Sequence, residues 1–202
     1  MAISLVTVGG KITAAIQNAI IGQVNAQGLT RIVPASVAGT GVSVGSGGIV
    51  MFTAATSVSV NGCFTTAFDN YRIVIATISR SVLAESLFRW RVGLVDNSTG
   101  NYSYVRGFDN AATRTVSGAS AQTSSIIDVG GGANDVLVDA FGPALPVATR
   151  FVGASNGLAA STTYNMSESS FFTAATVFDG FSYYMASGTI TGTLRIYGYN
   201  NN

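Results

Sequence analysis

The feature that most constrains this fold is a long series of short apolar segments that begins near residue 48 and runs to the C-terminus. Turn residues such as Asn61-Gly62 and Ser187-Gly188 separate the segments. No helical period interrupts the series, so it favours an antiparallel sandwich or barrel over alternating strands and helices. We therefore predict an all-β body with strands near 48–53, 57–60, 70–79, 87–95, 102–106, 123–129, 134–141, 147–153, 160–165, 175–185 and 189–199.

The last segment, from Thr189 to Tyr199, shows the strand period most clearly. Ile190, Leu194 and Ile196 fall on one face, because neighbouring side chains of a strand point to opposite sides. The other face is rich in Thr and Tyr and carries one charge, Arg195. We expect the first face to lie in a core, and the second suits contact with another chain as well as with water.

A second segment, from Tyr71 to Ile78, is apolar on both faces, so we expect it to be central or covered on both sides. Only 9% of the 202 residues are charged, against about 25% in an ordinary domain. Charge repulsion therefore protects the chain weakly against association. We infer that copies of the chain or a larger assembly cover much of its surface.

The net charge is +1, with ten basic and nine acidic residues spread along the chain. This pattern offers no basic patch for nucleic acid and no polybasic run for an anionic membrane. The longest apolar runs are too short to span a bilayer, and the N-terminus lacks the pattern of a signal peptide. We expect no nucleic-acid partner and no membrane insertion.

Residues 11–26 change to a helical period. A helix this short is marginal alone in water, so it needs a surface to pack on. That surface is either the β-body or a bundle of copies of the same helix. We place an anchor at residues 1–38, followed by a β-body at 39–202. The apolar stripe that would mediate anchoring or oligomerisation comprises Ile12, Ile16, Ala19, Ile20 and Val24.

The residue types limit the chemistry. The absence of His removes Ser-His-Asp and Cys-His nucleophile systems and every His-based metal site. Cys63 is alone, and we interpret it as a small buried hydrophobe. We expect no cofactor and no enzymatic activity.

Three aspartates are the candidates for catalysis or metal binding. Asp135 and Asp139 share one strand face, which leaves open a carbohydrate depolymerase with paired carboxylates, although an exposed strand face is favoured. Asp128 and Asp135 flank a glycine turn and are weak candidates for Ca²⁺, because the spacing is not that of a calcium loop. We therefore expect no metal.

Tyrosines in the middle of the chain are the candidates for contact with a ligand. Tyr102, Tyr104 and Tyr164 lie in predicted strands or at their edges. Tyrosine stacks on sugar rings and also packs at subunit seams, so residue type alone does not decide between these roles.

Four stretches resemble small tail-associated virion proteins of tailed bacteriophages, particularly those that infect actinobacteria. They are GKITAAIQNAIIGQVNAQ (10–27), RIVPASVAGTGV (31–42), SVSVNGCFTTAFDNYRIVI (57–75) and FDGFSYYMASGTITGTLRIYGY (178–199). The resemblance implies an N-terminal helix for attachment or trimerisation, followed by a jelly-roll β-sandwich. It also implies a minor tail or tail-fibre role with receptor binding, and it carries no catalytic residues.

Together these observations predict a structural virion protein, made in the bacterial cytoplasm and displayed on the tail as a homotrimer. Residues 1–38 would contact other virion proteins, and Tyr102, Tyr104 and Tyr164 would contact a host cell-surface glycan. A decoration or fibre protein on the phage head is the alternative. The depolymerase remains the weakest reading.

Overall fold

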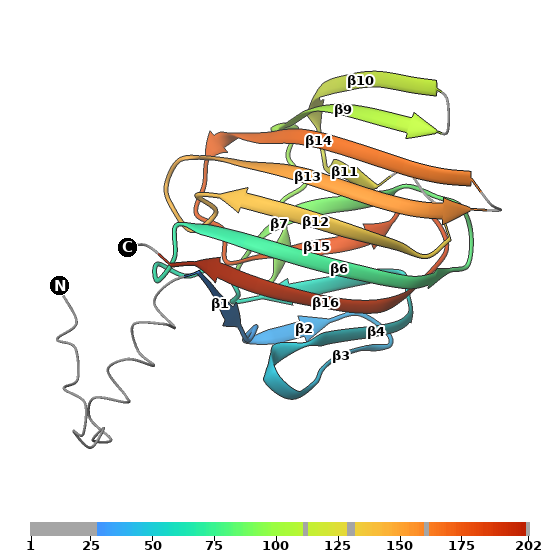
Figure 1. Ribbon diagram of the computed structural model, residues 1–202. Helices are drawn as coiled ribbons and strands as arrows, with labels where there is room; N and C mark the ends of the chain where they lie inside the picture. Colours follow the sequence, from blue (N-terminus) through green and yellow to red (C-terminus); the bar gives the residue numbers. More distant parts are fainter. Residues whose placement is uncertain (1–27, 111–112, 129–131, 160–161, 201–202) are drawn as a thin grey trace, which may run out of the picture.

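The computed structural model describes residues 28–110, 113–128, 132–159 and 162–200 and is built from two antiparallel sheets (Figure 1). The prediction of an all-β, antiparallel body is confirmed for these residues. Their helical structure is one 3₁₀ turn, Ser46–Gly48. The predicted N-terminal helix lies outside the described residues, as do Ile12, Ile16, Ala19, Ile20 and Val24.

The larger sheet is the framework of the molecule. Its strands, in spatial order, are β10 (Thr113–Gln122), β9 (Tyr102–Asn110), β14 (Thr162–Ala175), β13 (Ala148–Ala159), β12 (Asn134–Phe141), β6 (Asn70–Arg80), β16 (Ile190–Tyr199), β4 (Val50–Ala55) and β3 (Val42–Val44), with β1 (Leu29–Ile32) also paired to β16.

The smaller sheet faces one side of the larger one. Its strands, in spatial order, are β11 (Ser125–Asp128), β7 (Ser86–Val92), β15 (Gly180–Met185), β5 (Ser57–Asn61) and β2 (Ser36–Ala38), with β8 (Val95–Asp96) paired to β7.

Aromatic side chains from both sheets form the core between them. Phe88 on β7 stacks on Phe181 of β15, with ring centroids 5.2 Å apart. Phe151 reaches Phe88 from the larger sheet at 5.4 Å. Trp90 stacks on Phe178 at 5.5 Å. Rings of this size bury large apolar areas, so their contacts hold the two sheets together.

The predicted faces of β16 are confirmed by its burial. Ile190, Leu194 and Ile196 are fully buried, whereas the alternate side chains are half-buried on the outer face of the larger sheet. Two inward positions are glycines, and the Phe68 ring occupies the space that a Cβ on Gly198 would need. The inward glycines of β16 therefore leave the space that aromatic rings of the core occupy.

Strand β6 lies between β12 and β16, which confirms the predicted central position. Its inner residues, such as Ile73 and Ile75, are fully buried. Its outer residues Val74 and Ala76 are half-buried, and Ile78 is 66% exposed. The outer face is thus apolar without being covered by the described part of this chain.

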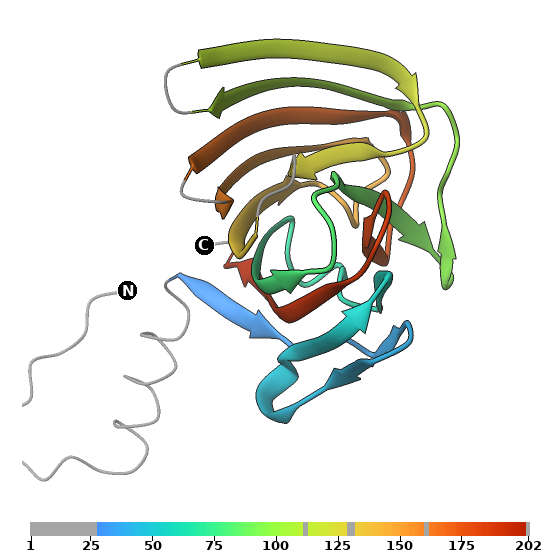
Figure 2. The ribbon, with the colours of Figure 1, turned by 90° about the vertical axis from the view of Figure 1, so that its right-hand side faces the viewer.

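One end of the larger sheet extends past the smaller sheet (Figure 2). Strand β10 is exposed or half-exposed at every position, so neither of its faces is covered by the described residues. We call the part formed by β9, β10 and the adjoining half of β14 the overhang. Strand β10 was not predicted, because TRTVSGASAQ lacks an alternating apolar pattern.

Residues 29–38, which the predicted boundary assigns to the anchor, contribute strands to both sheets. Leu29 to Ile32 pair with Tyr199 to Ile196 of β16, and β2 pairs with β5. The short strand β3 spans Val42–Val44. The predicted strand at 175–185 is shorter than expected, because regular pairing in β15 begins only at Gly180.

Candidate binding surfaces

Tyr102 is a core residue, which corrects its prediction as a receptor contact. Its side chain is fully buried, its hydroxyl donates to the Asn97 carbonyl at 2.8 Å, and the Trp90 amide donates to that hydroxyl at 2.9 Å. Burial raises the pKa of the Tyr102 phenol. The residue fastens the turn after β8 to the smaller sheet. The sequence did not reveal this burial, because a tyrosine at the start of a strand is apolar enough to lie either in a core or on a surface.

The other two predicted tyrosines lie on the same inner side of the overhang but at different levels, because Tyr104 pairs with Ser170 of β14 and Tyr164 pairs with Asn110 of β9. On β9, Tyr104, Arg106 and Phe108 alternate with outward residues and lie on the same side as the buried Tyr102. Tyr164 extends from β14 on that side, and its ring stacks on Phe108 with centroids 5.6 Å apart and 14° between the planes. We call Tyr104, Arg106, Phe108 and Tyr164 the overhang face.

Arg106 is held at the centre of this face by hydrogen bonds. Its Nη1 donates to Glu85 Oε1 at 3.0 Å, and its Nε donates to Ser117 Oγ at 3.0 Å. Its guanidinium carbon also lies 5.9 Å from the Tyr104 ring centroid, within the range of a cation–π contact. Burial raises the pKa of Tyr104, although the Arg106 charge opposes that shift.

Glu168 lies directly across from Arg106 on β14 and is 4% exposed. Neither carboxyl oxygen has a hydrogen-bond partner within the described ranges. Burial raises the Glu168 pKa to about 9, with Arg106 opposing the shift, so this side chain is neutral at pH 7. Sequence reasoning missed Glu168 because it ended the predicted strand at 165, and it did not single out Arg106 although that residue lay inside the predicted strand at 102–106.

The aspartates predicted as weak calcium ligands are not brought together. Asp128 is buried against the core, where it pairs with Arg80 and accepts a hydrogen bond from Ser155 Oγ at 3.3 Å. Asp135 is exposed on the outer face of β12. Within the described ranges, no group of three or more acidic or Cys side chains is placed to hold a metal.

Asp135 and Asp139 do share the outer face of β12, but their surroundings differ. Asp139 accepts two hydrogen bonds of 2.7 Å from Arg72 and one of 2.7 Å from the Tyr199 hydroxyl. Burial raises the pKa of Asp139, but these hydrogen bonds outweigh burial and hold it below its ordinary value. A general acid needs a raised pKa, so the lowered pKa of Asp139 does not suit that role in glycoside cleavage.

Asp135 belongs to a polar row that crosses the outer face. Cross-strand pairing places it beside Asn156, which lies beside Asn165, which in turn lies beside Asp109. Two adjoining hollows of about 410 and 370 Å³ are both lined by Asp135, Asn156 and Asn165. The outer face of the larger sheet is therefore hollowed along this polar row.

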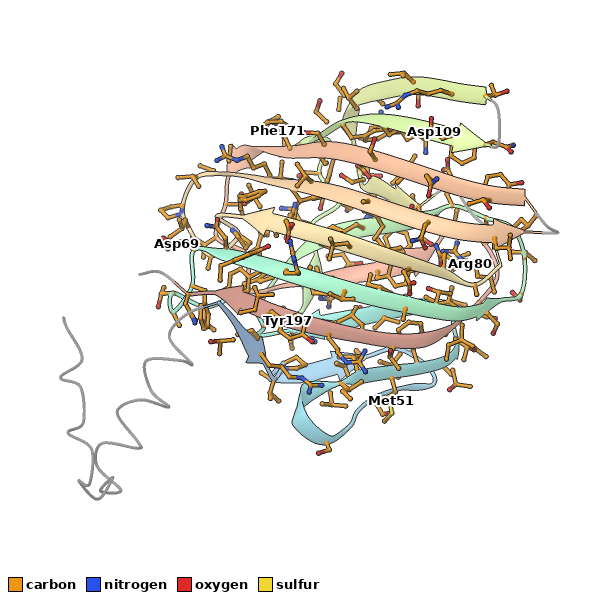
Figure 3. All side chains as sticks on the ribbon, in the orientation of Figure 1. Met51, Asp69, Arg80, Asp109, Phe171 and Tyr197 are labelled. Atoms are coloured by element: carbon orange, nitrogen blue, oxygen red, sulfur yellow. The ribbon has the colours of Figure 1, made fainter. Side chains whose placement is uncertain are left out.

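Apolar side chains are exposed on the same outer face, between the polar row and the opposite end of the strands. Val152 pairs across with Ser169, and Ser169 with Val105, so the two valines flank Ser169 on three neighbouring strands. We call Val105, Val116, Val152 and Phe171 the outer patch; they are between 47% and 66% exposed. Figure 3 labels Phe171, Asp109 and Tyr197, which come from β14, β9 and β16 of this face.

Cys63 is fully buried, and burial raises the pKa of its thiol, which matches its interpretation as a small hydrophobe.

Among the described residues there is no helix with the length and apolar character needed to cross a membrane. Comparison with family models, with curated protein sequences and with solved structures finds no significant match to this chain.

Proposed function

We propose that this chain is a structural virion protein of a tailed bacteriophage, a homotrimeric tail-fibre or minor tail protein with a role in binding a host receptor. The sequence stretches quoted above support the assignment to a virion. Residues 1–28, the part of the predicted anchor before β1, would join the protein to its neighbours in the tail. No catalytic step is included in the proposal.

The outer patch is the observation that carries the oligomeric part of this proposal. Val105, Val116, Val152 and Phe171 expose apolar surface on neighbouring strands, and the adjoining row is made of amide and carboxyl groups. Contiguous exposed apolar surface marks interaction sites in proteins. Interfaces also combine an apolar centre with hydrogen-bonding groups around it. A second copy of the chain bound at the outer patch would cover this apolar surface, which the few charged residues protect only weakly against non-specific association.

We further infer that the body is a jelly roll, a sandwich of eight strands in two Greek keys. The support is the strand order with the hairpins β9–β10 and β13–β14 and the short strands β1, β2, β3 and β8 set aside. The remaining run β4, β5, β6, β7, β11, β12, β15, β16 then occupies larger, smaller, larger, smaller, smaller, larger, smaller and larger sheet in turn. The last strand, β16, returns to lie between β4 and β6. Jelly rolls are frequent in viral coat proteins, which agrees with the proposed role.

Native mass spectrometry of the full chain tests the oligomeric part. We expect three times the 20.7 kDa chain mass at micromolar concentration. A persistent monomer under the same conditions would contradict the proposal.

Antibody labelling of virions in the electron microscope then tests the location. Labels along the tail are expected, whereas labels over the head would instead establish the alternative of a head decoration or head-fibre protein.

A further inference from the structure

We propose that the overhang face binds a neutral hexose unit of a host-surface glycan. This inference rests on the receptor-binding role proposed above and names the site and the ligand class for it. The residues that carry it are Tyr104, Arg106, Phe108 and Tyr164, together with Glu168.

The first support is that aromatic residues stand on a surface that the described residues leave only partly covered. Elsewhere the inward aromatic side chains are buried between the sheets, as Phe88 and Tyr102 are. Phe108 and Tyr164 face the same way but lie on the overhang, and both are only half-buried. Aromatic rings stack on the apolar C–H faces of sugars, so a partly exposed ring pair offers such a ligand a packing surface.

The second support is the charge balance of the face. The Arg106 guanidinium is compensated by Glu85, and its remaining carboxyl neighbour, Glu168, is neutral. An anionic sugar would therefore compete with Glu85 for a guanidinium already engaged, and a cationic sugar would meet the Arg106 charge. A neutral sugar meets neither opposing charge.

The third support is hydrogen-bonding capacity left unused. In the described part of the chain, the hydroxyls of Tyr104 and Tyr164 have no hydrogen-bond partner. The Glu168 carboxyl is also unpartnered and lies between the two tyrosines along β14 and β9. On β10, Thr115 adds a hydroxyl on the same side, because it pairs with Phe108. Hydroxyl-rich ligands are recognised by such groups, each of which donates and accepts.

Saturation-transfer NMR on the full chain tests the proposal. The neutral probes are glucose, galactose, mannose and N-acetylglucosamine; the charged probes are glucuronic acid and glucosamine. We expect at least one neutral probe to bind more tightly than both charged ones. Tyr164→Phe removes one hydroxyl and keeps the ring, so it should weaken that binding about fivefold. Phe108→Ala should weaken it about tenfold.

Tyr197→Phe, the same change on the outer face of β16, is the matched control and should leave sugar binding unchanged. Binding by no neutral probe, tighter binding of a charged probe, or unchanged binding in both overhang variants would overturn the inference. The native mass of the same samples separates it from the proposed function. A trimer without sugar binding removes only this inference, and a monomer that binds sugar removes only the trimer.

Discussion

The ion pair between Arg80 and Asp128 is nearly inaccessible to water, with side chains 1% and 5% exposed. Arg80 also donates to the Ala84 carbonyl, and Asp128 accepts from Ser155, so the pair ties β6 to β11 and β13. The desolvation free energy of burying two charges offsets most of their electrostatic attraction, so the pair itself adds little net stability. Removing one partner is different, because it leaves the other charge buried and unpaired.

We therefore expect Asp128→Asn to lower the free energy of unfolding by about 3 kcal/mol. Asp135→Asn is the matched control, since Asp135 is exposed and has no side-chain partner in the described residues; it should change stability by less than about 0.5 kcal/mol. Urea unfolding followed by circular dichroism measures both. Equal midpoints for the two variants would mean that Asp128 is not buried against Arg80 in solution.

Glu168 should make stability fall as the pH rises. Its pKa is about 9 in the folded chain and near 4.5 when unfolded, so between these values only the folded state holds the proton. The stabilisation is complete below pH 4.5 and is lost as the pH rises through the folded value. We expect wild type to lose about 1 kcal/mol per pH unit relative to Glu168→Gln between pH 5 and 8. Parallel urea midpoints for the two proteins across this range would refute the burial-raised pKa.

Strands were predictable where alternation or a two-sided apolar run marked them, as in β16 and β6, because the period of two reports a buried face directly. Strand β10 was missed for the converse reason. It buries neither face, so its sequence carries no apolar period, and only its pairing with β9 makes it a strand. β1 and β2 were assigned to the anchor and not to the β-body, because neither is long enough to show a strand period.

The inner face of β16 depends on glycine as much as on its aliphatic residues. A Cβ on Gly192 would overlap the Ala76 carbonyl oxygen of β6 and lie 3.0 Å from the Phe52 ring. Because both strands are central, neither can yield without disturbing its other neighbour. We expect Gly192→Ala to cost about 3 kcal/mol of unfolding free energy, measured by urea titration. Thr193→Ala, one position along on the outer face, should cost far less. A Gly192→Ala protein as stable as that control would show that β16 and β6 separate easily.

The candidate site illustrates what a sequence lacks. Alternation in β9 was visible and groups Tyr104 with Arg106, but whether that side is core or surface depends on where the smaller sheet ends. Tyr102 and Tyr104 share a side of one strand, yet the first is buried and the second is half-exposed. Glu168 joins Arg106 through pairing between strands about 60 residues apart, which no local pattern records. The burial of Tyr102 and the partial exposure of Tyr104 therefore depend on their positions relative to the edge of the smaller sheet.

The outer patch predicts how the whole molecule associates. Val105 is 59% exposed at the centre of the patch, and Val95 is 67% exposed on β8 of the other sheet. A carboxylate buried in an apolar interface loses its hydration without gaining a partner. If sister copies meet at the outer patch, Val105→Asp should weaken the trimer at least tenfold and yield monomer at micromolar concentration in native mass spectrometry. Val95→Asp adds the same charge at a similar exposure and should leave the trimer intact. Dissociation by Val95→Asp and not by Val105→Asp would move the contact between copies to the smaller sheet and leave the outer face open to solvent.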